Sequence, residues 1–183
     1  MAELKRALFL DRDGVINVDI GYLHRPGDCV FLPGIFELVR NARQAGYDVF
    51  VVTNQAGIAR GYYSEQTFAE FTAWMLEKFA AEGAPITQVY HCPHHPTAGI
   101  GEYKRECECR KPAPGMLLRA VAEHAVDVNA SVMVGDSVSD MEAAKAAGVK
   151  HRFLIGGENK AQVSGDFISI AELSQVAKSL HWI

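Results

Sequence analysis

The sequence predicts a three-layer α/β fold in which helices cover both faces of a mostly parallel sheet. Short apolar runs alternate along the chain with segments in which apolar residues recur at helical spacing. These runs are mostly apolar and do not alternate with polar residues, which is typical of strands buried on both faces. Strand–helix alternation of this kind builds parallel βαβ units. Because a chain of 183 residues can bury roughly 70% of its unfolded surface, we expect a single domain over residues 1–183.

Each expected element has a local reason. Five apolar runs are expected to be strands, at residues 7–10, 48–52, 88–90, 131–134 and 152–155. Helical spacing predicts helices at residues 35–42, 68–79, 114–121 and 141–147. A last helix is expected to begin at Ser169, because "SIAE" places Glu172 three residues later, as in a capping box. Residues 156–166 are expected to form a mobile surface loop.

Composition excludes some classes of protein. The 18 Lys and Arg residues against 22 Asp and Glu give a net charge of −4, which argues against nucleic acid or an anionic membrane as the main partner. No apolar stretch approaches the length of a membrane span, and "MAELKRALFLDRD" lacks the apolar core of a signal peptide. We therefore expect a cytoplasmic protein whose four cysteines are reduced thiols or metal ligands. The absence of a heptad repeat favours a monomer.

Polar residues follow three of the expected strands where each strand ends. Asp11 and Asp13 follow the first strand, residues 53–55 follow the second, and Asp136 and Asp140 follow the fourth. Ligands of parallel sheets bind beyond the carboxyl ends of the strands. Acids gathered there are tolerable around a divalent cation such as Mg²⁺, and nearby helix N-termini attract anions. The sequence therefore predicts a phosphate site at this edge of the sheet.

A second cluster has the spacing of a metal site. The stretch "CPHHPTAGIGEYKRECECRKP" contains a Cys-x-His pair and a Cys-x-Cys pair, which together make a closed structural Zn²⁺ set: Cys92, His94, Cys107 and Cys109. His91 and His95 are alternative ligands, and Cys29 is expected to be a small packed residue. Zinc would fix a loop that is too long and polar to fix itself, just before Lys111.

Four motifs in order, "LDRDGV", "VTNQ", "RKP" and "GDSVSD", resemble those of the haloacid dehalogenase (HAD) superfamily of phosphohydrolases, over residues 7 to about 155. The resemblance implies a Rossmann-like fold, here without a large cap domain. It implies that Asp11 is the nucleophile, which forms an aspartyl-phosphate, and that Asp13 is the general acid and base. Thr53 and Lys111 would hold the transferring oxygens. Asp11, Asp13 and Asp136 would bind Mg²⁺, with Asp140 beside the ion or orienting Lys111.

Within the superfamily, the zinc loop resembles those of two related families. The match to the D-glycero-D-manno-heptose-1,7-bisphosphate 7-phosphatases of heptose and lipopolysaccharide precursor synthesis is closer, and the histidinol-phosphate phosphatases are the alternative. A polynucleotide-end phosphatase and a zinc-organised binding module are further alternatives. The resemblance implies a sugar bisphosphate substrate and these binding residues: Arg12, Asp19, Tyr22, Asn54, Gln55, Ala56, Arg110 and Ser137. Ser137 departs from the family pattern, in which lysine is common at this position.

Overall fold

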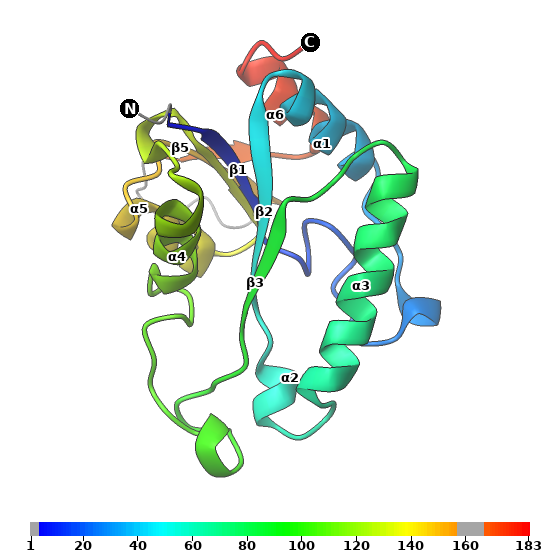
Figure 1. Ribbon diagram of the computed structural model, residues 1–183, viewed down its shortest axis with the longest axis vertical. Coiled ribbons are helices and arrows are strands. Elements are labelled where there is room, and N and C mark those ends of the chain that lie inside the picture. Colours follow the sequence, from blue (N-terminus) through cyan, green and yellow to red (C-terminus); the bar gives the residue numbers. More distant parts are fainter. Residues whose placement is uncertain (1–3, 157–166) are drawn as a thin grey trace.

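The computed structural model describes residues 4–156 and 167–183, which contain a six-stranded sheet of entirely parallel pairs. The strands lie in the order β3-β2-β1-β4-β5-β6, so β1 is central (Figure 1). Their bounds are β1 Arg6–Leu10, β2 Tyr47–Asn54, β3 Gln88–Cys92, β4 Val132–Gly135, β5 His151–Ile155 and β6 Ile168–Ile170. Leu10 pairs with Val51 of β2 and with Val134 of β4, so these three strands end close together.

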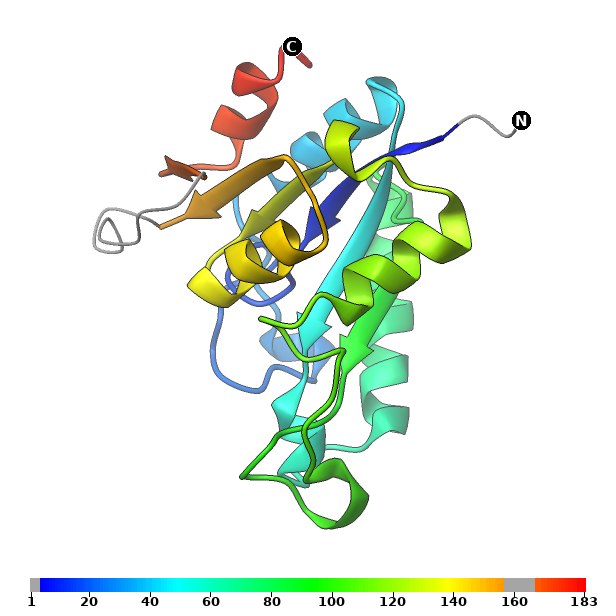
Figure 2. The same cartoon turned by 90° about the vertical axis from the view of Figure 1, so that its left-hand side faces the viewer.

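Helices cover both faces of the sheet and make three layers. The α-helices are α1 Ile35–Gln44, α2 Ala56–Ala59, α3 Glu65–Ala81, α4 Gly115–His124, α5 Val138–Ala146 and α6 Ser174–Ser179. Short 3₁₀ turns lie at Pro26–Asp28, Gly101–Tyr103 and Val128–Ala130. Helices α4 and α5 cover one face, and α1, α3 and α6 cover the other (Figure 2). The loop between β3 and α4 extends beyond the sheet beside α2 (Figure 1).

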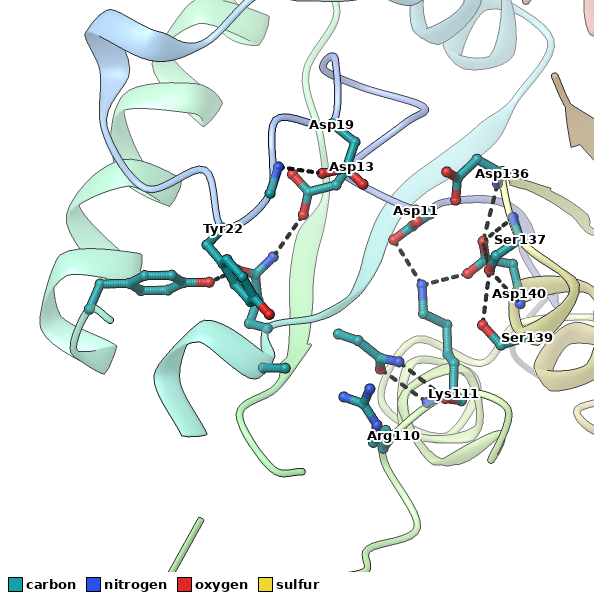
Figure 3. A pocket seen from close by; sticks show the side chains of 15 residues that line it. Asp11, Asp13, Asp19, Tyr22, Arg110, Lys111, Asp136, Ser137, Ser139 and Asp140 are labelled. Carbon is teal, nitrogen blue, oxygen red and sulfur yellow. Dashed lines mark hydrogen bonds and ion pairs between the residues drawn. The ribbon is translucent and has the colours of Figure 1, made fainter. Parts of the chain in front are cut away.

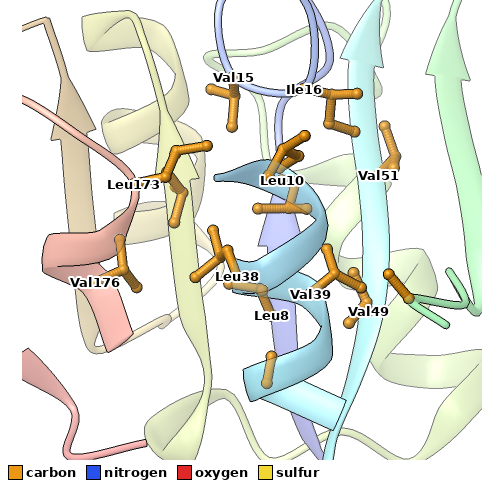
Figure 4. Packing of buried hydrophobic residues seen from close by; sticks show 14 of the residues in the cluster. Leu8, Leu10, Val15, Ile16, Leu38, Val39, Val49, Val51, Leu173 and Val176 are labelled. Carbon is orange, nitrogen blue, oxygen red and sulfur yellow. The ribbon is translucent and has the colours of Figure 1, made fainter. Parts of the chain in front are cut away.

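The continuous apolar runs are explained by a core on each face of the sheet. In β1, Leu8 and Leu10 pack against α1 and its neighbours (Figure 4), whereas Ala7 and Phe9 pack on the face covered by α4 and α5. All four are fully buried. Successive side chains of a strand leave on opposite faces, so a central strand needs apolar residues at every position. Each buried leucine contributes about 1.5–3 kcal/mol to the free energy of folding.

The five expected strands are confirmed, but the C-terminal segment was wrongly predicted. Ser169 lies in β6, where it pairs with Leu154, and α6 begins only at Ser174. The turn before α6 is held by Gln175, whose side chain accepts hydrogen bonds from the backbone of Ala171 and Glu172. The local capping pattern was overridden because β6 completes the edge of the sheet. Of the expected surface loop 156–166, all but Gly156 lies outside the described residues.

Within the described ranges, no helix combines the length and the apolar character needed to span a lipid bilayer.

Candidate active site

A cavity of about 380 Å³ lies beyond the carboxyl ends of the strands (Figure 3). It is lined by twelve residues that the sequence singled out: Asp11, Asp13, Asp19, Tyr22, Asn54, Gln55, Ala56, Arg110, Lys111, Asp136, Ser137 and Asp140. Gly21, Tyr63 and Ser139 line it as well. The predicted meeting of the strand ends at one edge is therefore confirmed as geometry. Arg12 and Thr53, which were also expected at the site, do not line the cavity.

Lys111 is held between two carboxylates on the floor of the cavity. Its Nζ lies 2.8 Å from Oδ1 of Asp11 and 2.6 Å from Oδ1 of Asp140, and it donates a hydrogen bond to the carbonyl of Val52. Burial opposes the charge of the ammonium, but Asp11 and Asp140 outweigh it and raise the pKa of Lys111. The lysine is therefore a fixed cation at the end of β1, because its charge is compensated on two sides.

The pKa of the Asp11 carboxyl is shifted strongly by its surroundings. Burial raises its pKa to about 8; Lys111 opposes this rise, and the nearby carboxylates of Asp140 and Asp136 add to it. One oxygen from each of Asp11, Asp136 and Asp140 lies within 4.8 Å of the others, which is close enough to share a cation. These three carboxylates carry more negative charge than the ammonium of Lys111 balances. Oxygen donors in this arrangement fit a hard divalent cation, which would also favour the ionised form of Asp11.

The carboxylate of Asp13 lies outside that group, so the expectation that Asp13 binds magnesium gains no support from its side chain and stays a prediction. Its oxygens accept hydrogen bonds from Arg12, Asn17 and Gln55, all of which hold it on the other side of the cavity. Figure 3 shows Asp13 directed toward the side of the cavity that contains Tyr22, apart from Asp136 and Asp140. The cavity therefore contains a group of acids around Lys111 and, apart from this group, the carboxylate of Asp13.

The corner between β4 and α5 is organised by Asp140. Its Oδ2 accepts hydrogen bonds from the backbone N–H groups of Asp136 and Ser137 and from the hydroxyl of Ser137, which caps α5. Its other oxygen contacts Lys111, so Asp140 connects this corner to the lysine. Glycine is required where the first loop approaches: Gly14 has φ +84°, and a Cβ there would lie 2.3 Å from Oδ2 of Asp136.

Asn54 ties the backbone of Lys111 to the end of β2. Its Oδ1 accepts from the backbone N–H of Lys111 at 3.0 Å, and its Nδ2 donates to the carbonyl of Lys111 at 3.1 Å. Asn54 also lines the cavity, but both ends of its amide are used in this contact. The structure therefore gives Asn54 a role in holding Lys111, which the expected role in substrate binding did not include.

Arg12 faces the protein interior, so the expectation that it binds substrate is corrected. Its side chain is 1% exposed and donates to the carboxylate of Asp13 and to the carbonyl of Leu23. Thr53 is also buried, and its Oγ1 accepts a hydrogen bond from Nε2 of Gln55 at 2.8 Å. This contact does not use the hydroxyl hydrogen of Thr53, so the hydroxyl can still donate a hydrogen bond.

The Cys/His cluster forms beside the site, with the four residues that the spacing favoured: Cys92, His94, Cys107 and Cys109. Five of the six distances among their sulfur atoms and Nδ1 of His94 are 3.1 to 3.8 Å, and all four ligand atoms lie within 4.8 Å of one another. Ligands of tetrahedral zinc, at about 2.3 Å for sulfur and about 2.0 Å for nitrogen, lie about 3.5–3.8 Å apart. The four atoms therefore fit a zinc ion and are too far apart for a disulfide.

The alternative ligands are used elsewhere. Nδ1 of His95 accepts hydrogen bonds from the backbone of Thr97 and Ala98, and His91 packs on the ring of Phe68. Cys29 packs beside the core of the α1 face, as expected. The cluster lies directly before Arg110, whose guanidinium donates to the carbonyl of His94 and lines the cavity. A metal ion in the cluster would therefore fix the backbone that carries Arg110 and Lys111.

Two residues that the sequence analysis missed contact the site. Asn17 donates to Asp13 from four residues along the chain, and the hydroxyl of Tyr63 donates to Oε1 of Gln55. Asn17 stands within the stretch "DRDGVIN", but nothing in the pattern shows that the chain turns back on itself there. Tyr63 lies in "GYYSE", where an aromatic residue is as typical of a core as of a site. Only the folded loops bring these side chains to Asp13 and Gln55.

Comparisons with known proteins agree with this geometry. A family described as HAD-hydrolase-like matches residues 108–181. A D-glycero-beta-D-manno-heptose-1,7-bisphosphate 7-phosphatase of Vibrio cholerae is 45% identical, over 98% of this chain and 96% of its own. The D-glycero-alpha-D-manno-heptose-1,7-bisphosphate 7-phosphatase of Burkholderia mallei is 54% identical, over 87% of this chain and 84% of its own. The crystal structure of a D,D-heptose 1,7-bisphosphate phosphatase from B. bronchiseptica, complexed with magnesium and phosphate, has a TM-score of 0.84 and 32% identity, over 96% and 98% of the two chains.

A parallel sheet with acids and a buried lysine at its carboxyl edge, without a large cap in the part of the chain that the structure describes, defines a phosphatase of the HAD superfamily. Sequence identities of 45% and 54%, over 98% and 87% of this chain, narrow the superfamily to one family. The protein belongs to the family of D-glycero-D-manno-heptose-1,7-bisphosphate 7-phosphatases.

Proposed function

We propose that this enzyme removes the 7-phosphate from D-glycero-D-manno-heptose 1,7-bisphosphate, a step in the synthesis of lipopolysaccharide precursors. The observation that carries the proposal is the buried contact between Asp11 and Lys111 at the carboxyl end of the central strand. Relatives named for this activity are 45% and 54% identical to this chain. A carboxylate held beside a fixed cation can attack a phosphoryl group whose oxygens the same cation helps to neutralise.

The reaction takes two steps. Oδ of Asp11 attacks phosphorus and forms an aspartyl-phosphate, while the bond from phosphorus to the sugar oxygen breaks and Asp13 gives its proton to that oxygen. Asp13 then takes a proton from water, which attacks the same phosphorus and releases inorganic phosphate, restoring Asp11. Lys111 and the hydroxyl of Thr53 bind the phosphoryl oxygens in both steps, which lowers the barrier by neutralising charge that is spread over them.

Magnesium is the cation that we propose for the acid group. Asp11 and Asp136 would hold it, and the magnesium and phosphate complex of the B. bronchiseptica neighbour supports this choice. When bound, the ion supplies positive charge to the phosphoryl oxygens and keeps Asp11 ionised. We assign Asp140 mainly to Lys111 and to the β4–α5 corner, since both of its oxygens already have partners there.

Zinc is the ion that we propose for the Cys/His cluster, with a structural role. Three thiolates and one imidazole close the tetrahedron and leave no position for substrate. Thiolate ligands persist under reducing conditions, which supports a location in the cytoplasm. We further propose that residues 1–183 act as one domain, because a single sheet carries the residues assigned to the reaction, and as a monomer, a proposal supported by the absence of a heptad repeat in the sequence.

Arg110 is proposed to bind the second phosphate of the substrate, together with contacts from Asp19, Tyr22, Gln55, Ala56 and Ser137, which line the cavity. The planar guanidinium of arginine suits bidentate binding of phosphate. Its attachment to the carbonyl of His94 supports a preset position, because the Cys/His cluster would fix that carbonyl.

Replacing Arg110 by alanine is expected to lower kcat/KM for the bisphosphate about 10–100-fold, the equivalent of about 1.5–3 kcal/mol for a hydrogen bond to a charged group. The loss for a simple monophosphate should be small, because that substrate has no second phosphate for Arg110. Steady-state phosphate release from both substrates measures the difference. Lys104→Ala, which removes an exposed cation from the same loop, is the matched control. Equal losses on both substrates would contradict the second-phosphate role.

The proposed substrate is tested by phosphate release from a panel in the presence of Mg²⁺. The panel contains both anomers of heptose 1,7-bisphosphate, histidinol phosphate and a 3′-phosphorylated oligonucleotide. We expect the highest kcat/KM for one of the heptose anomers, because the cavity combines two cationic side chains, Arg110 and Lys111. A preference for histidinol phosphate or for the oligonucleotide would overturn the proposed substrate while leaving the phosphatase chemistry intact.

A further inference from the structure

Arg12 is a charged residue buried in the protein interior directly behind Asp13. Its side chain is 1% exposed, whereas that of Asp13 is 23% exposed and faces the cavity. The guanidinium donates to the carbonyl of Leu23 at 2.8 Å, and its Cζ lies 5.0 Å from the centre of the Phe71 ring. Burying a cation is costly unless it is paired, and the pair here is Asp13 itself. Arg12 is thus anchored by the core and directed at a carboxylate in the cavity.

The contacts make the two oxygens of Asp13 unequal. Oδ1 accepts from Nε of Arg12 at 3.2 Å, from NH2 of Arg12 at 2.9 Å and from Nδ2 of Asn17 at 3.0 Å. Oδ2 has two contacts among the described residues, 3.1 Å to NH2 of Arg12 and 3.3 Å to Nε2 of Gln55. A carboxylate oxygen has about two lone-pair positions, so three donors saturate Oδ1. Oδ2 has fewer donors, and the longer of its two contacts comes from a neutral amide that a reacting oxygen can displace, so Oδ2 is the oxygen more open to proton exchange.

A general acid must be within hydrogen-bond reach of the atom that it protonates, and a misplacement of about 1 Å can cost about 10²-fold in rate. Asp13 lies in a loop, and its remaining partners are the neutral amides of Asn17 and Gln55. Arg12 supplies all three of its charge-assisted contacts, which are about twice as strong as neutral ones. The orientation of Asp13 therefore depends mainly on Arg12.

We propose that Arg12 is a positioning residue, which locks Oδ1 of Asp13 and thereby presents Oδ2 to the leaving sugar oxygen. Oδ2 transfers its proton to that oxygen as the phosphorus–oxygen bond breaks, and later takes a proton from the water that attacks the aspartyl-phosphate. This assignment rests on the proposed phosphatase function. It gives Arg12 a role through Asp13 and none through contact with the substrate.

The test uses Arg12→Met, which keeps an unbranched apolar side chain in the core but lacks the guanidinium and cannot donate hydrogen bonds. On the sugar bisphosphate, we expect kcat to fall about 10²–10³-fold, within the range of general acid–base catalysis, with KM changed less than about threefold. On p-nitrophenyl phosphate, nitrophenolate leaves without a proton, so the first step should stay fast. Because the second step still needs Asp13, we expect a burst of about one nitrophenol per enzyme molecule, followed by slow turnover.

Two further variants separate positioning from a general structural effect. Arg152→Met removes another buried guanidinium, which donates to the carbonyl of Val149 away from the cavity, and it should show no burst. Arg12→Lys keeps the positive charge but loses the planar guanidinium with its paired donors. Compared with Arg12→Met, it should have a higher kcat on the sugar bisphosphate and a smaller burst on the aryl ester. Asp13→Asn removes the carboxylate itself, and its loss of kcat on the sugar bisphosphate is the limit that the loss in Arg12→Met should approach. The lysine variant also decides the question if Arg12→Met does not fold.

The outcomes distinguish the positioning role from the proposed function. If the wild-type enzyme releases phosphate from neither substrate, the proposed function fails. If the wild-type enzyme is active but Arg12→Met lowers the first turnover of both substrates equally, or matches Arg152→Met on both, the positioning role fails. A burst with the aryl ester together with a selective loss on the sugar ester supports it.

Discussion

Replacing Asp11 by asparagine is expected to lower kcat about 10⁴–10⁶-fold, the scale of loss when a catalytic nucleophile is removed. The amide has nearly the same volume but no negative charge with which to attack phosphorus. No aspartyl-phosphate can then form at this position, so the reaction loses the step in which the phosphoryl group leaves the sugar. Single-turnover assays with trapping of the phosphoenzyme measure both the rate and the intermediate.

The same substitution should not weaken the fold. The pKa of Asp11 is raised because its charge is buried among other carboxylates, so the ionised group destabilises the folded state near neutral pH. We expect the Tm of Asp11→Asn to be equal to or above that of the wild-type protein without divalent cations. Asp48→Asn is the control, since Asp48 pairs with Lys5 and Arg43 at the opposite end of the sheet and should keep full activity. Unchanged turnover in Asp11→Asn would contradict the proposed nucleophile.

Removing zinc is the second change with a large expected effect. The enzyme is treated with a chelator, the chelator is removed, and excess Mg²⁺ is added. We expect kcat/KM to fall about 10²-fold or more, because the backbone that carries Lys111 is then no longer fixed by the Cys/His cluster. A shift of about 1 Å is enough for such a loss. Asn54 would remain as the other attachment. Zinc content by mass spectrometry, measured alongside activity, checks the expectation.

The zinc result can be controlled with the chain's own cysteines. Cys109→Ser removes one ligand of the cluster and should reproduce the effect of chelation, whereas Cys29→Ser changes a packed cysteine outside it and should leave zinc content and activity unchanged. Addition of Zn²⁺ should restore the chelated wild-type protein but not Cys109→Ser. Full activity in a demetallated sample supplied with Mg²⁺ would show that the cluster does not position Lys111.

The buried strands of the sheet could be predicted from the sequence. The four strands of the interior, β1, β2, β4 and β5, are runs of apolar residues with a packed core on both sides, and such runs are visible in the sequence. β6 has only three residues, two of them exposed, so no pattern marks it. Its pairing with β5 placed Ser169 in a strand, although the local sequence around this residue is typical of a helix start.

The types of functional group at the site could be predicted from the sequence, because residue type and position after a strand determine which groups lie at the sheet edge. The directions of the side chains could not. Arg12 stands between two acids of the cavity but faces the core, and Asn54 holds the backbone of Lys111 from 57 positions away. The choice of His94 over His91 and His95, in contrast, was already favoured by the spacing of the pairs, and the folded loop brings the same four residues together.

The sequence by itself determined the parallel α/β architecture, the acids at the strand ends and the cysteine pairs, since each of these follows from residues close together in the chain. Only the tertiary structure decided that Lys111 meets Asp11 across 100 positions, that Asp13 stands apart from the other acids, and that a buried arginine holds it there. The physical reason is that side-chain orientation is set by contacts between distant segments, and those contacts exist only after the layers have packed.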